Sequence, residues 1–145
     1  MLVSQILQNK GKNVVTTTPE KTLQALVPVF KSKRLGTIVV TDRSGKVVGM
    51  LSERDIVLAL ANHGVDALTM NVAELMATAV MTCGPDDDVK KVMAIMTHRR
   101  ARHLPVVEHG RLSGMVSIGD VVKHHLEETE LEVNVLRDYA RVRIA

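Results

Sequence analysis

The chain nearly lacks aromatic side chains. Among its 145 residues there is no Trp, and the only Phe and Tyr are Phe30 and Tyr139. This disfavours nucleic-acid modules that stack bases on aromatic side chains, and it equally disfavours aromatic cages for quaternary ammonium ligands. If a nucleobase binds, it must lie between aliphatic side chains and backbone.

Cysteine and long apolar runs are scarce as well. The single Cys83 excludes an internal disulfide framework and suits a reducing compartment. We interpret it as a small packed residue, although its place beside a helix start leaves a lowered thiol pKa open. No apolar run reaches the roughly 18 residues of a membrane-spanning helix, and the N-terminus lacks the features of a secretory signal. We therefore expect a soluble cytoplasmic protein without membrane contacts.

Charge and motif content exclude further classes. The formal net charge is +3, but the 19 basic and 16 acidic residues are interspersed, which is weak support for a nucleic-acid partner. The six His residues form no HExxH motif and no Cys/His cluster, so no metal site is expected. Because no P-loop, GxGxxG motif or identifiable catalytic set is present, we do not expect an enzyme.

What the chain does contain is an internal repeat. Residues 14–57 align with residues 80–122 at an offset of 65 to 67 residues. A flanking segment repeats too, since Ser4–Leu7 resembles Ala73–Met76. The matched positions are Pro19 and Pro85, Gly45 and Gly110, Gly49-Met50 and Gly114-Met115, Ser52 and Ser117, and Asp55 and Asp120.

Each copy is predicted to run strand, helix, strand, strand, helix. This gives an α/β (α+β) fold of two β-α-β-β-α repeats, packed through their sheets with pseudo-twofold symmetry. Thr18-Pro19 is expected to begin the first helix, with Thr as N-cap, and Pro85 marks the equivalent start. The continuous β run Thr37–Thr41 predicts a strand buried on both faces, followed by a hairpin turn at Asp42–Gly45. Ser52 is expected to cap the next helix.

The repeat divides the chain into three segments. Residues 1–64 hold the first repeat with an N-terminal flanking helix, residues 65–126 the second with a linker helix, and residues 127–145 a C-terminal helical extension. The last helix is predicted from Asp120 to about Tyr139 on a loose apolar stripe. It exceeds what one repeat needs, so part of it is available to pack on another subunit.

The two copies resemble a tandem pair of CBS (cystathionine β-synthase) domains, a Bateman module, of the stand-alone bacterial type. The match covers roughly residues 2–125, and it is carried by Gly49–Asp55, Gly114–Asp120 and Arg102–Val107. The resemblance implies a flat homodimer that binds AMP, ADP, ATP, NAD(H) or S-adenosylmethionine in two clefts between the repeats. It also implies that a ligand-dependent shift regulates a partner protein, which the sequence does not identify.

By this resemblance each cleft combines both repeats. Asp55 and Asp120 would accept hydrogen bonds from ribose hydroxyls, and the helix starts at Ser52 and Ser117 would seat phosphate. Gly119 would let the backbone approach a phosphate closely. Site A comprises Thr18, Arg34, Gly36, Arg102, Ser117, Gly119 and Asp120. Site B comprises Gly84, Ala101, His103, Ser52, Arg54 and Asp55, and its Gly84 departs from the Thr that is usual before the Pro.

The Ser and Asp residues of both sites also have a purely structural interpretation. Ser-x-x-Asp is also a variant of the capping box, which needs no ligand. The function we expect is an adenosine-nucleotide sensor, and the alternative is a ligand-independent dimeric scaffold with degenerate pockets. Whether the purified chain carries nucleotide distinguishes the two.

Overall fold

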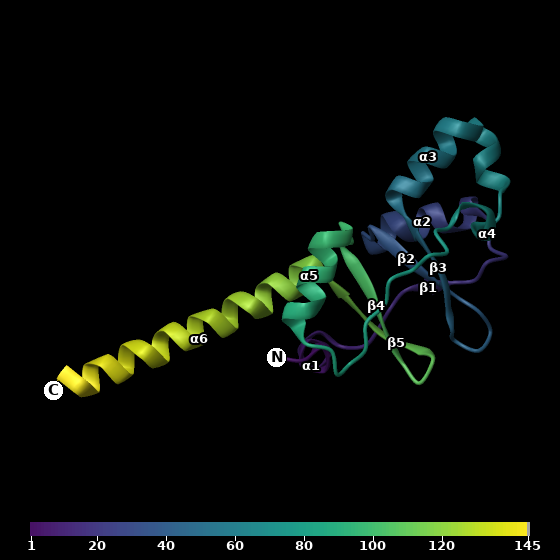
Figure 1. The fold of residues 1–145 in the computed structure, drawn as a ribbon. Coiled ribbons are helices and arrows are strands. Elements are labelled where there is room, and N and C mark those ends of the chain that lie inside the picture. The colour runs from purple at the N-terminus through teal and green to yellow at the C-terminus, as the bar shows by residue number, and fades with distance from the viewer. Residues whose placement is uncertain (145) are drawn as a thin grey trace.

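The computed structural model describes residues 1–144, which form two small sheets with helices beside them and one long projecting helix (Figure 1). The elements are α1 (Val3–Lys10), β1 (Thr16–Thr17), α2 (Leu23–Lys33), β2 (Thr37–Thr41), β3 (Val47–Ser52), α3 (Glu53–His63), the 3-10 helix η1 (Gly64–Thr69), α4 (Val72–Leu75), α5 (Val89–Arg99), β4 (His103–Glu108), β5 (Arg111–Ser117) and α6 (Ile118–Ile144).

The two sheets repeat one pattern. β1 pairs in parallel with β2, and β2 pairs antiparallel with β3. In the second copy β4 pairs antiparallel with β5, and Cys83 bridges in parallel to Val106 where β1 would lie. The predicted strand Thr37–Thr41 is confirmed, and its three central residues are fully buried. The expected α/β fold of two repeats is therefore present.

Both first helices begin later than the sequence predicted. α2 begins at Leu23, because Thr22 rather than Thr18 is the N-cap, and its Oγ1 accepts from Ala25 N at 3.3 Å. α5 begins at Val89 after the N-cap Asp88. The residues around each Pro form turns whose carbonyls accept hydrogen bonds from elsewhere in the chain, so tertiary pairing overrides the Thr-Pro signal.

The flanking helices are exchanged between the repeats. α1 packs Val3, Ile6 and Leu7 into the core of the second repeat, and its first turn donates from Ser4 N to Pro85 O at 2.9 Å. The linker helix α4 instead completes the first repeat, where Val72 joins the core. Consequently the sequence segments 1–64 and 65–126 do not each enclose one core.

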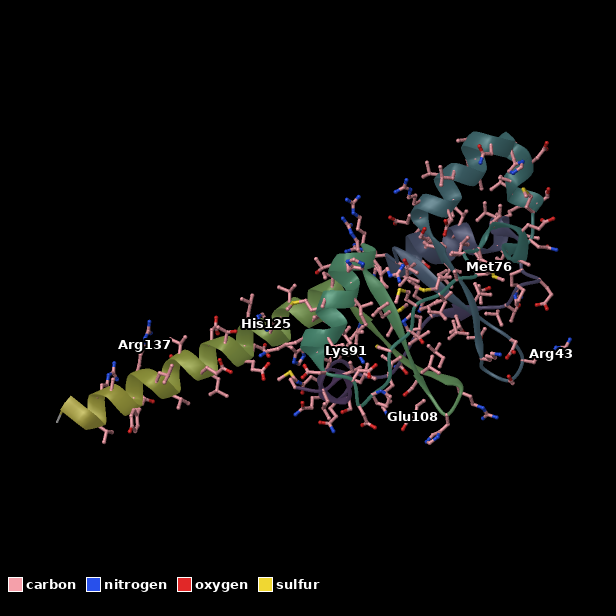
Figure 2. All side chains as sticks on the ribbon, viewed as in Figure 1. Arg43, Met76, Lys91, Glu108, His125 and Arg137 are labelled. Carbon is pink, nitrogen blue, oxygen red and sulfur yellow. The ribbon has the colours of Figure 1, made fainter. Side chains whose placement is uncertain are left out.

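Two equivalent glycines make room for the exchanged helices. A Cβ on Gly114 would lie 2.9 Å from both Leu7 Cδ atoms. A Cβ on Gly49 would overlap Met76 and lie 3.0 Å from Ala77 O; Met76 is labelled beside this strand in Figure 2. Because Leu7 and Met76 are the matched positions of the repeated flanking segment, the Gly positions are explained by this packing.

α6 is longer than predicted and leaves the body of the protein (Figure 1). Its first part is anchored by Val121 and His124, which are 0% and 5% exposed. From residue 131 to residue 142 every residue is exposed. Over residues 1–144 no helix combines the length and the apolar character needed to cross a bilayer.

Candidate functional site

The matched Ser and Asp residues sit at helix starts and bond to each other. Ser52 Oγ accepts from Asp55 N at 3.1 Å, and Asp55 Oδ2 accepts from Ser52 N at 2.8 Å. The second repeat does the same, with Ser117 Oγ 3.1 Å from Asp120 N and Asp120 Oδ2 2.9 Å from Ser117 N. The capping arrangement therefore exists in both repeats.

These caps leave one donor for a ligand at the start of α6. Ile118 N donates to Arg102 O at 2.8 Å and Asp120 N donates to Ser117 Oγ. No bond to the described residues occupies Gly119 N, which lies between them. Gly119 is exposed, and the atom nearest to a hypothetical Cβ there is Ser117 Oγ at 3.6 Å. A phosphate oxygen has access to this N–H.

The sequence did not predict that Lys10 joins the site. Lys10 ends α1, and its Nζ lies 2.7 Å from Asp120 Oδ2 and 3.0 Å from Met115 O. Burial raises the pKa of Asp120, but the bonds from Lys10 and Ser117 outweigh this effect and hold the pKa below its usual value. A carboxylate accepts about four hydrogen bonds, so capacity for ribose hydroxyls remains.

A cavity of about 320 Å³ lies beside this ion pair, and we call it the Lys10 cleft. It brings together three predicted site A residues, Arg34, Gly36 and Ser117, and so joins the two repeats. Its size reaches the lower end of the range for small-molecule sites. The full lining is Lys10, Asn13, Val14, Val15, Arg34, Leu35, Gly36, Thr37, His103, Met115 and Ser117.

His103 lies between two cavities. It lines the Lys10 cleft and also a second cavity of about 340 Å³ beside Met50, which we call the Met50 cleft. Its Cε1 is 4.0 Å from where a Gly36 Cβ would be. Burial lowers the pKa of His103, Lys10 and Arg102 lower it further, and Asp120 opposes them. His103 is therefore kept neutral near pH 7.

The Met50 cleft holds part of the predicted site B. Ala101 and His103 line it, together with Arg99 and residues 77 and 79–81 of the linker. Ser52 and Asp55 are paired with each other two and five residues beyond Met50, and Arg54 is exposed on the first turn of α3. None of these three lines the Met50 cleft.

The remaining predicted residues, Thr18, Gly84 and Arg102, line neither cleft. Thr18 lines a separate hollow beside the β2–β3 turn, with Asp42 and Arg43. Gly84 N donates to Asp87 Oδ2 at 2.7 Å, and Gly84 O accepts from Asp87 N at 3.2 Å. The backbone N–H of Gly84 is thus occupied by Asp87, whereas its carbonyl oxygen keeps a second lone pair for another donor. Arg102 is exposed, and its carbonyl accepts from the first turn of α6.

Cys83 proves to be a core residue. It is 5% exposed, and burial, with the nearby Asp87 carboxylate, raises the pKa of its thiol to about 12. The lowered pKa left open by the sequence is therefore wrong, because apolar surroundings outweigh the neighbouring helix start. The described residues contain no group of three or more His, Cys, Asp or Glu side chains placed to hold a metal ion.

Comparison with known proteins identifies the family and the fold. The model of the CBS domain matches residues 3–62 and 72–127. A crystal structure of a CBS-domain containing protein from Agrobacterium tumefaciens, ATU1752, superposes with a TM-score of 0.80 at 39% identity, over 86% of this chain and 99% of that one.

Two further solved structures hold adenosine-containing ligands. The cytosolic domain of the Mg²⁺ channel MgtE, in complex with ATP, is 28% identical with a TM-score of 0.66, over 76% of this chain and 44% of that one. The CBS domain pair of protein MJ0100, in complex with 5-methylthioadenosine and S-adenosyl-L-methionine, is 24% identical with a TM-score of 0.76, over 88% and 98%.

Proposed function

Because the chain belongs to the CBS-domain family, we propose that it is a regulatory module that binds an adenosine nucleotide in the Lys10 cleft. One observation carries the proposal: this cleft joins the two repeats beside the Lys10–Asp120 pair. The ligands held by the MgtE domain and the MJ0100 pair support the adenosine class.

The lining of the cleft and the start of α6 beside it support a role for each part of such a ligand. Asp120 accepts from the ribose hydroxyls, because a carboxylate beside a helix start is a strong acceptor. Lys10, Arg34 and Gly119 N supply positive charge and a donor for phosphate. Val14, Leu35 and Met115 offer aliphatic walls to the adenine. Affinity then rests on ribose and phosphate more than on base stacking.

Binding in this position acts on the relation between the repeats. Arg34 belongs to the first repeat, whereas Asp120 belongs to the second, so a ligand that contacts both favours one relative orientation. A ligand shifts such an equilibrium only by its differential affinity for the two states, and coupling of about 1–3 kcal/mol is typical. The proposed module is a non-catalytic homodimer that passes this shift to a partner protein.

The test is calorimetric titration and thermal unfolding with AMP, ADP, ATP, NAD(H) and S-adenosylmethionine. At a concentration hundredfold above Kd, we expect the ligand to raise Tm by about 5–10 °C. Asp120→Asn removes binding in the Lys10 cleft, whereas the matched Asp55→Asn retains it. No Tm shift with any of these ligands at millimolar concentration overturns the proposal.

A ligand-independent scaffold remains the second candidate, and one observation favours it. α3 exposes Val57, Leu58 and Leu60, which are 64%, 48% and 42% accessible, and such apolar surface is typical of a protein contact. Mass spectrometry of the denatured purified protein separates the two functions. Released adenosine nucleotide supports the sensor, and nucleotide-free protein that fails the titration supports the scaffold.

A further inference from the structure

The outer half of α6 extends far from the rest of the protein (Figure 1), and it carries exposed apolar residues. The 27 residues of α6 correspond to about 40 Å at 1.5 Å per residue. Every residue from 131 to 142 is exposed, among them Leu131, Val133, Val135 and Leu136. In proteins most helical stability comes from packing of an apolar face, so a partner that covers these residues would stabilise the outer half of α6.

Leu131, Val135 and Val142 lie on the side of α6 that continues from His124, whereas several of the other exposed apolar residues form a seam with alternating spacings of four and three. At 3.6 residues per turn, the seam lies opposite the buried His124. The spacing is that of the a and d positions of a heptad, with Thr129 as one polar member. The seam consists of Val122, Leu126, Thr129, Val133, Leu136 and Ala140.

The charges beside the seam are complementary between two copies of the same helix. With Leu126, Val133 and Ala140 at a and Val122, Thr129 and Leu136 at d, the g residues precede each a and the e residues follow each d. In a parallel, in-register pair, each g residue faces the e residue five positions further along the other helix. Glu132 then faces Arg137 of the second copy, and His125 faces Glu130 of the second copy. Twofold symmetry repeats both pairs. Figure 2 shows Arg137 and His125 on this helix.

The antiparallel alternative places like charges together. When two copies of α6 pack antiparallel through the same seam, the e residues of one helix face the e residues of the other. Glu130 then faces Glu130 of the second copy, and Lys123 faces Arg137 of the second copy. Like charges in these positions oppose pairing, so the parallel orientation is favoured.

The surface of the helix supports the same seam. A hollow of about 300 Å³ is lined entirely by α6 residues, namely Thr129, Glu130, Val133, Asn134 and Arg137. Three of these, Thr129, Glu130 and Val133, belong to one of the holes into which a side chain of a facing helix inserts. We propose that α6 pairs with α6 of a second copy as a parallel two-stranded coiled coil through Leu126, Val133 and Leu136.

This inference is independent of nucleotide binding. It predicts that two copies of the protein are tied at the same end, with their CBS bodies on the same side of the coil. The contact uses neither cleft, and it leaves α3 exposed. A dimer is therefore expected for variants such as Asp120→Asn that lose ligand.

Site-specific cross-linking tests the seam in the full chain. In a parallel pair a d residue faces its own copy, so Leu136→Cys is expected to form an intermolecular disulfide under mild oxidation at low micromolar protein. Val135→Cys is the matched control, because it lies one residue away and about 100° around the helix. The native Cys83 is buried and contributes little background.

The outcomes separate the alternatives. Equal cross-linking of Val135→Cys and Leu136→Cys overturns the seam. Cross-linking only between Leu126→Cys and Leu136→Cys in a mixture overturns the parallel orientation. A monomeric mass by light scattering at high micromolar protein overturns self-pairing altogether. Circular dichroism checks that each variant folds.

A charge exchange tests the proposed pairs. Glu132→Lys and Arg137→Glu are each expected to weaken dimerisation roughly tenfold, since two pairs are lost per dimer. The double variant restores the complementarity and is expected to dimerise close to the unaltered chain. A double variant weaker than both single variants overturns the pairing of Glu132 with Arg137.

Discussion

Lys10 and Asp120 are 110 positions apart in the chain, yet Lys10 Nζ lies 2.7 Å from Asp120 Oδ2. This pair ties the end of α1 to the carboxylate that we assign to the ribose. A group that approaches Asp120 must therefore share the carboxylate with the Lys10 side chain or displace that side chain.

The first prediction concerns this ion pair and pH. Because the pKa of Asp120 is lower in the folded protein than in the unfolded chain, the pair stabilises the fold above about pH 4. This stability is lost as pH falls through the folded pKa. Lys10→Met is expected to lower the unfolding free energy at pH 7 by about 0.5–1 kcal/mol, and the loss becomes smaller as pH falls below about 4. Urea titrations measure it, with Lys12→Met as control. A loss that persists unchanged at pH 2 assigns the effect to packing of the side chain.

The second prediction concerns His103. Lys10 lowers its pKa, whereas Asp120 raises it, so the two substitutions should act in opposite directions. Lys10→Met is expected to raise the pKa of His103, and Asp120→Asn to lower it further. NMR titration of the imidazole signals measures both, with His103→Gln to assign the resonance. Shifts in the same direction would contradict the arrangement of these three groups.

The third prediction concerns the glycines beneath the exchanged helices. Gly49→Ala and Gly114→Ala are each expected to destabilise the fold by about 1–3 kcal/mol through overpacking. Gly49→Ala should cost more, because its Cβ meets the backbone oxygen of Ala77, whereas that of Gly114 meets only the Leu7 side chain. Gly119→Ala is the control, since its Cβ has ordinary contacts. Chemical denaturation gives the ranking, and equal stability of all three variants would contradict it.

The fourth prediction concerns Cys83. With a thiol pKa of about 12 and a buried side chain, almost no thiolate exists at pH 8, and iodoacetamide is expected to react far more slowly than with the unfolded chain. Mass spectrometry follows the alkylation, and the same reaction in 6 M guanidinium chloride is the reference. Comparable rates in both conditions would show that Cys83 is accessible and reactive.

Local signals were sufficient for part of this structure. The strand Thr37–Thr41 and the cap at Ser52 were predicted because β-branched runs and N-caps act over a few residues. The helix start at Thr18 was wrong because Thr22 offers an equivalent cap, and only contacts with α4 decide between them. Long-range pairing also explains why sequence reasoning missed Lys10.

The site was predicted to a similar extent. Arg34, Gly36 and Ser117 line one cleft, because the repeats place the segment before β2 near the end of β5, and their contact with a ligand stays a prediction. Thr18 and Gly84 do not join them, because the chain before each Pro bonds to its own turn. Lys10 could be identified as a site residue only after the structure showed that α1 packs against the second repeat.

The exchange of flanking helices gives the protein an order of assembly on the ribosome. The first repeat is completed by α4, which is translated directly after it. In contrast, α1 emerges first, but the strands that it packs against, up to Val116, are translated last. α1 must therefore wait, with Val3, Ile6 and Leu7 uncovered, until β5 has been made.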